Sequence, residues 1–451
     1  MRISVIGCGY LGTVHAAALS ALGHVVTAVD TDKAKVHQLS DGGVPFFEPG
    51  LARLLDAGRH AGTLRFTSAF VEVADCDVHF LCVGTPQQKT THHADVTHVF
   101  SAVDALIGHL HEGSVVVGKS TVPAGTSAAL LRLLAGTGAE LAWNPEFLRQ
   151  GTAVDDSLQP DRLVYGVADG DAGVRVSTVL DEVYAPLLDK GVPRLVTGFK
   201  TAELAKSAAN AFLALKLSYM NGIAELCDGI GADVSALADA LGLDSRIGGR
   251  YLSAGAGFGG GCLPKDVRSL GAQAQDAGAH SLATLLGLVD DMNFGARQRI
   301  HDAARDMCGG DLSARRITVL GAAFKPHTDD VRDSPSIDIA LRLARSGADV
   351  TITDPQAVRK AWLNYPQLRF EADTLEALRG AELTLLLTEW PEFCALSPAD
   401  AASVVSRTAV LDGRNALPAD IWRSAGWEYR GIGRGASSNS VAGTVGASAA
   451  I

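Results

Sequence analysis

The chain opens on a short apolar run that leads directly into a glycine loop and then a helical stretch. The run is Ile3–Ile6, and the loop is Gly7-Cys-Gly-Tyr-Leu-Gly12, a GxGxxG sequence. Such glycines permit a tight turn and a close approach to pyrophosphate, which binds at the N-terminus of the following helix. The next apolar run, Val25–Asp30, ends on a carboxylate that can bond a ribose 2′-hydroxyl and repel a 2′-phosphate. This order predicts a strand–turn–helix–strand unit that favours NAD over NADP, with FAD as the less favoured alternative.

Further apolar runs continue the alternation. Val78–Val83 and Val115–Lys119 are mostly apolar without regular polar alternation, which is typical of buried parallel strands. Helical sequence separates them, so the first part of the chain is predicted to form a doubly wound α/β sheet.

The same order of segments returns near the other end of the chain. Ile317-Thr-Val-Leu-Gly-Ala-Ala is similar to the first strand and loop, Gly347–Asp354 to the second strand, and Leu383–Leu387 to Val78–Val83. The repeat predicts two doubly wound Rossmann-like domains. The second loop, Gly321-Ala-Ala-Phe-Lys-Pro, lacks the second and third glycines, so NAD is not expected there.

A helical section separates the two α/β units. Thr201–Asp228 has no Pro and no Gly before Gly222, which predicts one long central helix, and helical sequence follows at Val234–Leu241 and from Asp266 to about Cys308. The predicted divisions are an NAD-binding domain at 1–200, a helical connector and dimerisation domain at 201–308, a nucleotide-sugar-binding domain at 309–432, and a disordered tail at 433–451, rich in Gly, Ser and Ala.

Composition narrows the functional classes. The net charge of -11 argues against nucleic acid or an anionic membrane as the main partner. No apolar run approaches the ~20 residues that span a bilayer, and no signal peptide is recognisable. Seven scattered cysteines without a CxxC pair favour reduced thiols in the cytoplasm over disulfides or structural zinc. His92-His93 lacks a third ligand at usable spacing, so no metal is expected.

One segment points to covalent chemistry. Gly255-Ala-Gly-Phe-Gly-Gly-Gly-Cys-Leu-Pro-Lys-Asp266 places Cys262 after a glycine-rich loop, at a predicted helix N-terminus and near Lys265. That setting is expected to lower the thiol pKa. A lone cysteine is more often a small buried apolar residue. The surrounding loop nevertheless favours a nucleophile.

Polar residues at predicted strand ends could complete a site. Glu146 follows an apolar run, and Thr121 follows another at the same sheet edge, where ligands bind in such folds. Lys206 and Asn210 lie one turn apart on the long helix. Taken alone, Glu146 could be a solvated loop carboxylate, and Lys206 and Asn210 an ordinary polar helix face.

Taken together, these segments resemble the UDP-glucose/GDP-mannose dehydrogenase family. The resemblance runs from residue 1 to about 430, and its motifs appear in order. They are GxGxxG at 7–12, NPEFLR at 144–149, ELAKSAAN at 203–210, FGGGCLPKD at 258–266 and AFKPHTDDVRDSPS at 323–336.

The resemblance implies oxidation of the C6 alcohol of a nucleotide sugar to a carboxylate with two NAD per turnover, and UDP-glucose to UDP-glucuronate is the expected reaction. The Cys262 thiolate would trap the aldehyde as a thiohemiacetal, which a second oxidation converts to a thioester for hydrolysis. Lys206 and Asn210 would stabilise the oxyanion. Asp266 and Thr121 would hold a water involved in proton transfer, and Glu146 would be the base for hydrolysis.

The resemblance also implies two sets of binding residues. Those expected at NAD are Gly7, Gly9, Tyr10, Leu11, Gly12, Asp30, Thr85, Thr121, Lys265 and Arg332. Those expected at the nucleotide sugar are Glu146, Phe147, Leu148, Lys206, Asn210, Arg246, Tyr251, Gly259, Lys325 and Arg414, with Arg246 supplied by the neighbouring subunit of a homodimer.

One position departs from the family pattern. Family members commonly read NPEFL-x-E, whereas this chain has Gln150, which can hydrogen-bond but cannot accept a proton at neutral pH. Hydrolysis could therefore be slower here.

Three alternatives stay open at the level of sequence. One is oxidation of another nucleotide sugar, GDP-mannose or UDP-N-acetylmannosamine. The second is a simple β-hydroxyacid dehydrogenase, which needs no cysteine and makes one NADH. The third is a non-catalytic nucleotide-sugar binder, which only Gln150 suggests.

Overall fold

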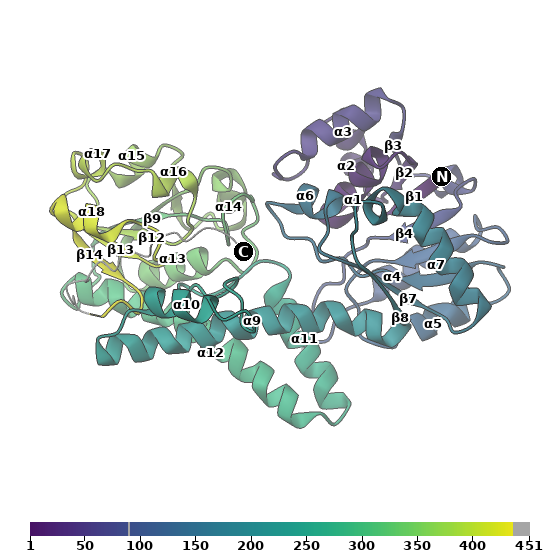
Figure 1. Ribbon diagram of the computed structural model, residues 1–451. Helices are drawn as coiled ribbons and strands as arrows, with labels where there is room; N and C mark the ends of the chain where they lie inside the picture. Colours follow the sequence, from purple (N-terminus) through teal and green to yellow (C-terminus); the bar gives the residue numbers. More distant parts are fainter. Residues whose placement is uncertain (89–90, 436–451) are drawn as a thin grey trace.

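The computed structural model describes residues 1–88 and 91–435, which form two α/β domains with long helices between them (Figure 1). The first domain contains an eight-stranded sheet in the order β3-β2-β1-β4-β5-β6-β7-β8. Neighbouring strands are parallel except for β6 and β7. The strands are β1 Arg2–Ile6, β2 Val25–Val29, β3 Leu64–Thr67, β4 Val78–Leu81, β5 Val115–Gly118, β6 Glu140–Trp143, β7 Leu163–Val167 and β8 Arg194–Gly198.

Helices cover both faces of this sheet (Figure 1). They are α1 Tyr10–Ala21, α2 Lys33–Ser40, α3 Leu51–His60, α4 Thr97–Ile107, α5 Thr126–Leu133, α6 Ala153–Leu158, α7 Asp171–Val183 and α8 Ala185–Leu188, with a 3₁₀ turn at Phe70–Val73. Strands β1, β4 and β5 are almost entirely buried, as expected for strands covered on both faces. Because β1, β4, β5 and β6 run parallel, their carboxyl ends meet at one edge of the sheet.

Long helices join the two domains (Figure 1). The predicted central helix is α9, which runs over Phe199–Ile230 and ends at Gly231 in a left-handed conformation. Helix α10, Val234–Gly242, follows. The helical stretch expected from Asp266 to Cys308 is divided into α11, Leu263–Asp276, and α12, His280–Met307. The left-handed Gly278 lies between them, where a continuous α-helix is disfavoured.

The second domain repeats the parallel architecture with six strands in the order β11-β10-β9-β12-β13-β14. The strands are β9 Arg316–Leu320, β10 Asp349–Thr353, β11 Arg369–Phe370, β12 Leu383–Leu386, β13 Ala409–Asp412 and β14 Glu428–Gly431. The helices are α13 Pro335–Arg345, α14 Val358–Asn364, α15 Thr374–Leu378, α16 Pro391–Cys394, α17 Pro398–Ala402 and α18 Ala419–Ser424. The predicted pair of Rossmann-like domains joined by a long helix is therefore confirmed.

The chain end falls partly outside the described residues. Gly433 packs against α9, where its N–H donates to Asp228 Oδ2 at 3.2 Å and its carbonyl accepts from Val234 N at 2.8 Å. The remainder of the predicted tail, 436–451, is outside the described residues. Within residues 1–88 and 91–435, no helix combines the length and apolar character needed to cross a membrane.

Candidate active site

The first glycine loop has the geometry that a dinucleotide needs. Gly7 has φ of 98°, and a Cβ on Gly12 would lie 1.8 Å from the Gly7 carbonyl oxygen. Glycine at 12 therefore lets α1 begin directly beside the loop. A Cβ on Gly9 would meet no atom within 4 Å, so the backbone there is open to a ligand. Tyr10 and Leu11 form the first turn of α1, and both are half-buried.

Asp30 lies directly after β2, beside this loop. Its Oδ2 accepts from Cys8 N at 2.8 Å and from Lys35 Nζ at 2.9 Å, and its Oδ1 accepts from Asp32 N at 2.9 Å. Burial raises the pKa of Asp30, but these hydrogen bonds outweigh it and hold the pKa below its usual value. An ionised carboxylate beside an open glycine backbone fits the ribose and pyrophosphate of NAD.

The carboxyl ends of β4 and β5 bring two further predicted residues together. Thr85 Oγ1 donates to the Thr121 carbonyl oxygen at 2.7 Å. Both residues follow parallel neighbouring strands, so they lie at the same sheet edge as the glycine loop.

A second cluster combines residues of the first domain, α9 and α11. Lys206 Nζ lies 3.1 Å from Glu146 Oε1, although the Lys206 side chain is only 5% exposed. Asn210 Nδ2 donates to Asp266 Oδ2 at 2.6 Å, and Lys265 Nζ donates to Asp266 Oδ1 at 2.7 Å. The structure thus brings together residues predicted from three separate motifs.

Burial lowers the pKa of Lys206, but the charges of Glu146, Cys262 and Asp266 outweigh it, so this pKa stands above its usual value. A buried cation among these groups is placed to hold an oxyanion.

Cys262 is the N-cap of α11, as predicted, but the expected lowering of its pKa is wrong. Its side chain is exposed, but desolvation by the protein around the site raises the thiol pKa. Lys206 and Lys265 lower the pKa, whereas Glu146 and Asp266 raise it. The local sequence showed the helix N-terminus, Lys265 and Asp266, but not the desolvation or the remote Glu146 carboxylate.

The glycine loop before Cys262 touches the second domain. A Cβ on Gly259 would lie 2.2 Å from the Asp333 carbonyl oxygen, and one on Gly261 would lie 2.5 Å from the Arg332 guanidinium carbon. At Gly259 two backbones approach, so a side chain there would clash, whereas at Gly261 the contact is with the end of the Arg332 side chain.

Helix α12 fixes the same loop: Asn293 Oδ1 accepts from Phe258 N at 2.7 Å, and Asn293 Nδ2 donates to Phe258 O at 3.0 Å. Arg297, 2% exposed, also donates to Phe258 O at 3.1 Å. The sequence interpretation missed both supports, because nothing in α12 marks them.

The second domain contributes predicted substrate and cofactor residues. Lys325 is half-buried, and burial lowers its pKa although Glu48 and Cys262 act to raise it. Arg414 donates to the backbone carbonyls of Leu387 at 2.7 Å and Gly257 at 3.2 Å, so it ties the second domain to the glycine loop.

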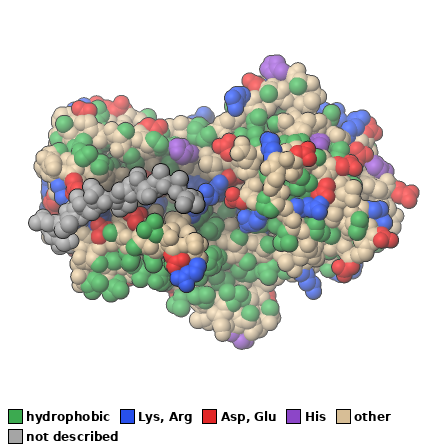
Figure 2. All heavy atoms as spheres, viewed as in Figure 1, with side chains coloured by type: hydrophobic (Ala, Val, Ile, Leu, Met, Phe, Trp, Pro, Cys, Tyr) green, Lys and Arg blue, Asp and Glu red, His purple; other side chains and the backbone are tan. Residues whose placement is uncertain are grey.

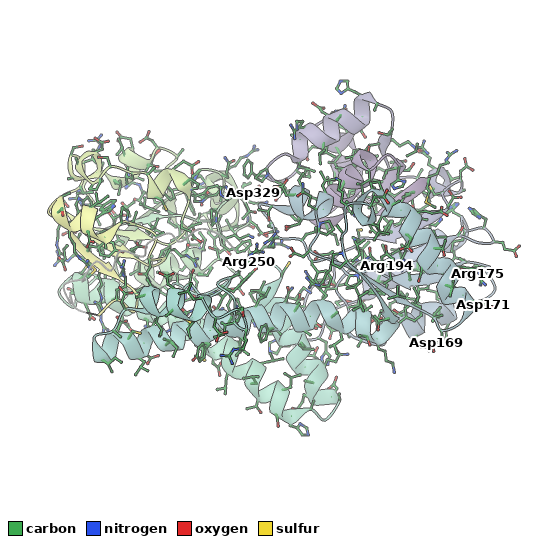
Figure 3. All side chains as sticks on the ribbon, viewed as in Figure 1. Asp169, Asp171, Arg175, Arg194, Arg250 and Asp329 are labelled. Atoms are coloured by element: carbon green, nitrogen blue, oxygen red, sulfur yellow. The ribbon has the colours of Figure 1, made fainter. Side chains whose placement is uncertain are left out.

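Arg332 forms a bidentate pair with Asp330, and its side chain is 64% exposed. Figure 3 labels the neighbouring Asp329, on the edge of the second domain that faces the first. Figure 2 shows that the molecular surface is hollowed between the two domains.

Two predicted contacts of the NPEFLRQ loop frame Glu146. The Arg162 guanidinium lies over the Phe147 ring at 3.8 Å from its centroid, and Lys206 Nζ lies 5.7 Å from the same centroid. The Leu148 N–H donates to Glu146 Oε2 at 2.5 Å. The carboxylate is therefore held by one cation and one backbone amide.

Two further predicted substrate residues lie in the segment after α10. Tyr251 is half-buried and has φ of 63°. Arg246 is not brought to Cys262 within one chain: its side chain is 87% exposed and pairs with Asp244.

Two residues at the domain junction were not predicted as contacts. Gln150 Nε2 donates to Asp330 Oδ2 at 3.0 Å, across the two domains. Glu48 accepts from Gly151 N and Ala153 N at 2.7 Å each, and it also accepts from Tyr10 OH. Burial raises the pKa of Glu48. No local pattern marks Glu48, since its partners are remote in sequence.

His93 Nε2 pairs with Asp276 Oδ2 at 2.7 Å. Across the described part of the chain, no three His, Cys, Asp or Glu side chains lie close enough to hold a metal ion.

Comparison with known proteins gives matches along nearly the whole chain. Three models of the UDP-glucose/GDP-mannose dehydrogenase family match: the NAD binding domain at 1–188, the central domain at 200–294 and the UDP binding domain at 318–419.

Curated relatives include UDP-glucose 6-dehydrogenase of Rhizobium meliloti, 40% identical over 96% of this chain and 100% of that protein. UDP-glucose 6-dehydrogenase YwqF of Bacillus subtilis is 38% identical over 96% of this chain and 98% of that protein. Among solved structures, a UDP-glucose dehydrogenase from Pyrobaculum islandicum superimposes with a TM-score of 0.86 at 34% identity, covering 96% of each chain.

Proposed function

This chain belongs to the UDP-glucose/GDP-mannose dehydrogenase family, and on that premise we propose that it oxidises UDP-glucose to UDP-glucuronate with two NAD per turnover. The observation that carries the proposal is the cluster of Lys206, Glu146, Asn210 and Asp266 around the accessible Cys262. Such a cluster can stabilise an oxyanion, trap an aldehyde and hydrolyse the resulting thioester.

Each residue has one place in the sequence of steps. Gly7–Gly12 and Asp30 would hold NAD, with Tyr10, Leu11, Thr85, Lys265 and Arg332 as further contacts. The bound cofactor would supply the two-electron acceptor for each oxidation. Lys206 and Asn210 hold the C6 oxygen, while Asp266 and Thr121 hold a water that carries its proton away. Sulfur of Cys262 bonds to the aldehyde carbon, and after the second oxidation Glu146 activates the water that breaks the C–S bond.

The remaining predicted residues would bind the nucleotide sugar. Phe147 and Leu148 shape the loop around Glu146, and Gly259 leaves room beside Asp333. Lys325 and Arg414 of the second domain, with Tyr251, would contact the nucleotide part. The uridine base and glucose follow from the relatives at 38–40% identity.

A homodimer would complete the site. The exposed face of α9 carries Phe212, Tyr219 and Leu226, which are 61%, 53% and 55% exposed at a seven-residue spacing. Figure 2 shows hydrophobic side chains gathered around the helices between the two domains. Pairing of α9 with a second copy would bury this apolar stripe. It would also allow the exposed Arg246 to act in the neighbouring site. Light scattering of the purified protein tests the dimer; a monomer at micromolar concentration would refute it.

We also propose that the chain works in the cytoplasm and that its domains divide near 200 and 308. The thiol chemistry of Cys262 requires a reduced sulfur, which a reducing compartment maintains.

The decisive experiment is the stoichiometry of NADH. Incubation with UDP-glucose and NAD should release two NADH per sugar, and Cys262→Ser should abolish acid formation. Substrate should also protect the wild-type thiol from alkylation. One NADH per sugar would indicate a simple dehydrogenase, and turnover of GDP-mannose alone would overturn the substrate. Unchanged behaviour of Cys262→Ser would indicate a binder without covalent chemistry.

A further inference from the structure

A small cavity is lined in part by the loop that carries Glu146. It has a volume of about 50 Å³, and its walls include His15, Lys119, Glu146, Ser157 and Asp161. Asp161 is exposed, whereas His15 and Lys119 are buried, so the cavity runs inward from the surface. A water molecule needs roughly 10–15 Å³ of such space and two to four polar partners. The cavity is large enough for water if its walls supply the partners.

His15 supplies one partner. It lies on α1 with 5% exposure, and its ring packs edge-on against Phe80 at 4.6 Å between centroids. Burial lowers its pKa well below the usual value, so the imidazole is neutral. Its Nε2 is buried and has no hydrogen-bond partner among the described residues. Buried polar atoms nearly always have a partner, and when protein supplies none, ordered water does.

Lys119 supplies the second partner. It follows β5, is 7% exposed, and donates to Asn144 Oδ1 at 2.8 Å. Its contact with Tyr184 OH is longer, at 3.4 Å, and Tyr184 OH itself donates to Asn144 Oδ1 at 2.7 Å. An ammonium group has three donors, so at least one N–H is available to the cavity. Burial lowers the pKa of Lys119 to about 8, and the charges of Cys82 and Glu146 act to raise it.

Glu146 connects this cavity to the reaction centre. It lines the cavity, its Oε1 pairs with Lys206 at 3.1 Å, and the charges of both groups act on the Cys262 thiol. Substrate and cofactor exclude water from the front of a dehydrogenase site while they are bound. The back of Glu146 is therefore the side from which water can reach the carboxylate during the covalent stage.

We propose that the cavity lined by His15 and Lys119 stores water and delivers it to Glu146 for hydrolysis of the thioester on Cys262; this rests on the proposed function. Water adds its oxygen to the carbonyl carbon while Glu146 takes a proton, and the C–S bond then breaks. The products are the sugar carboxylate, the Cys262 thiol and one proton, which leaves through the cavity. No electron is transferred in this step.

The test is to fill the cavity without touching the catalytic cluster. Ser157 is half-buried on α6 and lines the cavity, so Ser157→Leu places apolar atoms in the water path. Gln159→Leu, at the exposed end of the same helix, is the matched control. Rapid mixing of enzyme with UDP-glucose and NAD follows the NADH burst, and intact mass of quenched enzyme detects the sugar acid bound to Cys262.

Ser157→Leu should keep the burst of two NADH per site, lose about tenfold in steady-state turnover, and accumulate the covalent adduct. Gln159→Leu should behave as wild type. Equal turnover of the two variants with no adduct would refute the water route alone. Absence of the second NADH from wild type would instead refute the proposed function. Should Ser157→Leu not fold, a high-resolution crystal structure of wild type decides: water bridging His15 Nε2 and Lys119 Nζ supports the route, and a dry cavity overturns it.

Discussion

The two α/β domains share one architecture but use the same loop position differently. In each, an acidic residue directly follows the second strand, Asp30 after β2 and Asp354 after β10. Asp30 accepts from two backbone amides and Lys35, and α1 begins three residues beyond Gly7. Asp354 is 3% exposed and accepts from four backbone amides and Trp390 Nε1. Asp30 therefore lies beside a glycine loop whose backbone is free to contact a ligand. Asp354 instead ties the loop after β9 to the domain through its own hydrogen bonds.

The difference follows from the residues after the shared glycine. Gly321 has φ of 111° and Gly7 has φ of 98°, so the backbone makes a similar turn after the first strand of each domain. The second loop then continues to Ser334 before α13 begins, and it carries Lys325 and Arg332 toward the first domain. A helix N-terminus directly after the strand makes a dinucleotide site, whereas a long loop there makes side-chain contacts for a neighbouring site.

The largest expected effect comes from Gly12→Ala. The new Cβ would lie 1.8 Å from the Gly7 carbonyl oxygen, so α1 and the loop must separate. NAD affinity should fall at least about 100-fold because the binding geometry is displaced, and unfolding free energy by about 2 kcal/mol. NADH fluorescence titration and thermal unfolding measure the two effects.

Gly9→Ala serves as the control for folding, since its Cβ meets no protein atom within 4 Å. It should leave the free energy of unfolding unchanged and lower only the affinity for NAD. Wild-type NAD binding by Gly12→Ala would show that close helix packing is not what distinguishes the first domain.

Asp354→Ala should mainly destabilise the protein. The change leaves five N–H donors, four of them in buried residues, without their acceptor, which costs about 3 kcal/mol. A lower denaturation midpoint in urea, with NAD affinity preserved, is the expected result. A loss of NAD affinity without a loss of stability would contradict the assignment of Asp354 to loop closure.

Asp30→Ala should show the opposite pattern, with a smaller free-energy effect. NAD affinity should fall about tenfold, as for loss of a charged hydrogen bond of roughly 1.4 kcal/mol. Lys35 remains, so a 2′-phosphate is no longer repelled and NADP should be used more readily. Initial rates with NAD and NADP measure this, with Asp32→Asn, which keeps the α2 cap position polar, as the control. An unchanged ratio of NAD to NADP use would show that Asp30 does not select the cofactor.

Much of the fold could be predicted because parallel strands buried on both faces appear as apolar runs. The starts of β1 and β9, the glycine loop at 7–12 and the long α9 each follow from local sequence. The glycine-rich loop marked Cys262, whereas the resemblance to the family supplied the roles of the other reacting groups. The structure places Lys206, Glu146, Asn210 and Asp266 in one cluster with Cys262.

The rest depends on contacts between distant segments. The predicted lowering of the Cys262 pKa was wrong, because the local sequence reveals neither the desolvation nor the Glu146 charge that raise this pKa. The partners of Glu48 and the supports from Asn293 and Arg297 are likewise remote. Local periodicity gave no sign that His15, on an ordinary buried helix face, would line a cavity while its Nε2 lacks a partner in the described part of the chain.

Gln150, the position that departs from the family pattern NPEFL-x-E, makes such a remote contact. Its neutral amide donates to Asp330 at 3.0 Å, and the same carboxylate pairs with Arg332. Burial raises the pKa of Asp330, but Arg332 and Gln150 outweigh it, so this pKa lies below the usual value. The amide therefore links the two domains and supports the position of Arg332.

Gln150→Glu should have the smallest effect, because Arg332 can pair with both carboxylates. The new charge faces Asp330 and raises the pKa of that carboxyl, so the apparent affinity for NAD should fall roughly threefold at neutral pH. The defect should shrink as pH falls, since protonation of either carboxyl relieves the repulsion. Measurement of KM for NAD between pH 5 and 8 (roughly the range where shifted carboxyls titrate) checks the sign, with Gln159→Glu as the control for added surface charge. If Gln150→Glu instead accelerates decay of the Cys262 adduct and leaves KM for NAD unchanged, position 150 acts on hydrolysis and not on the link between the domains.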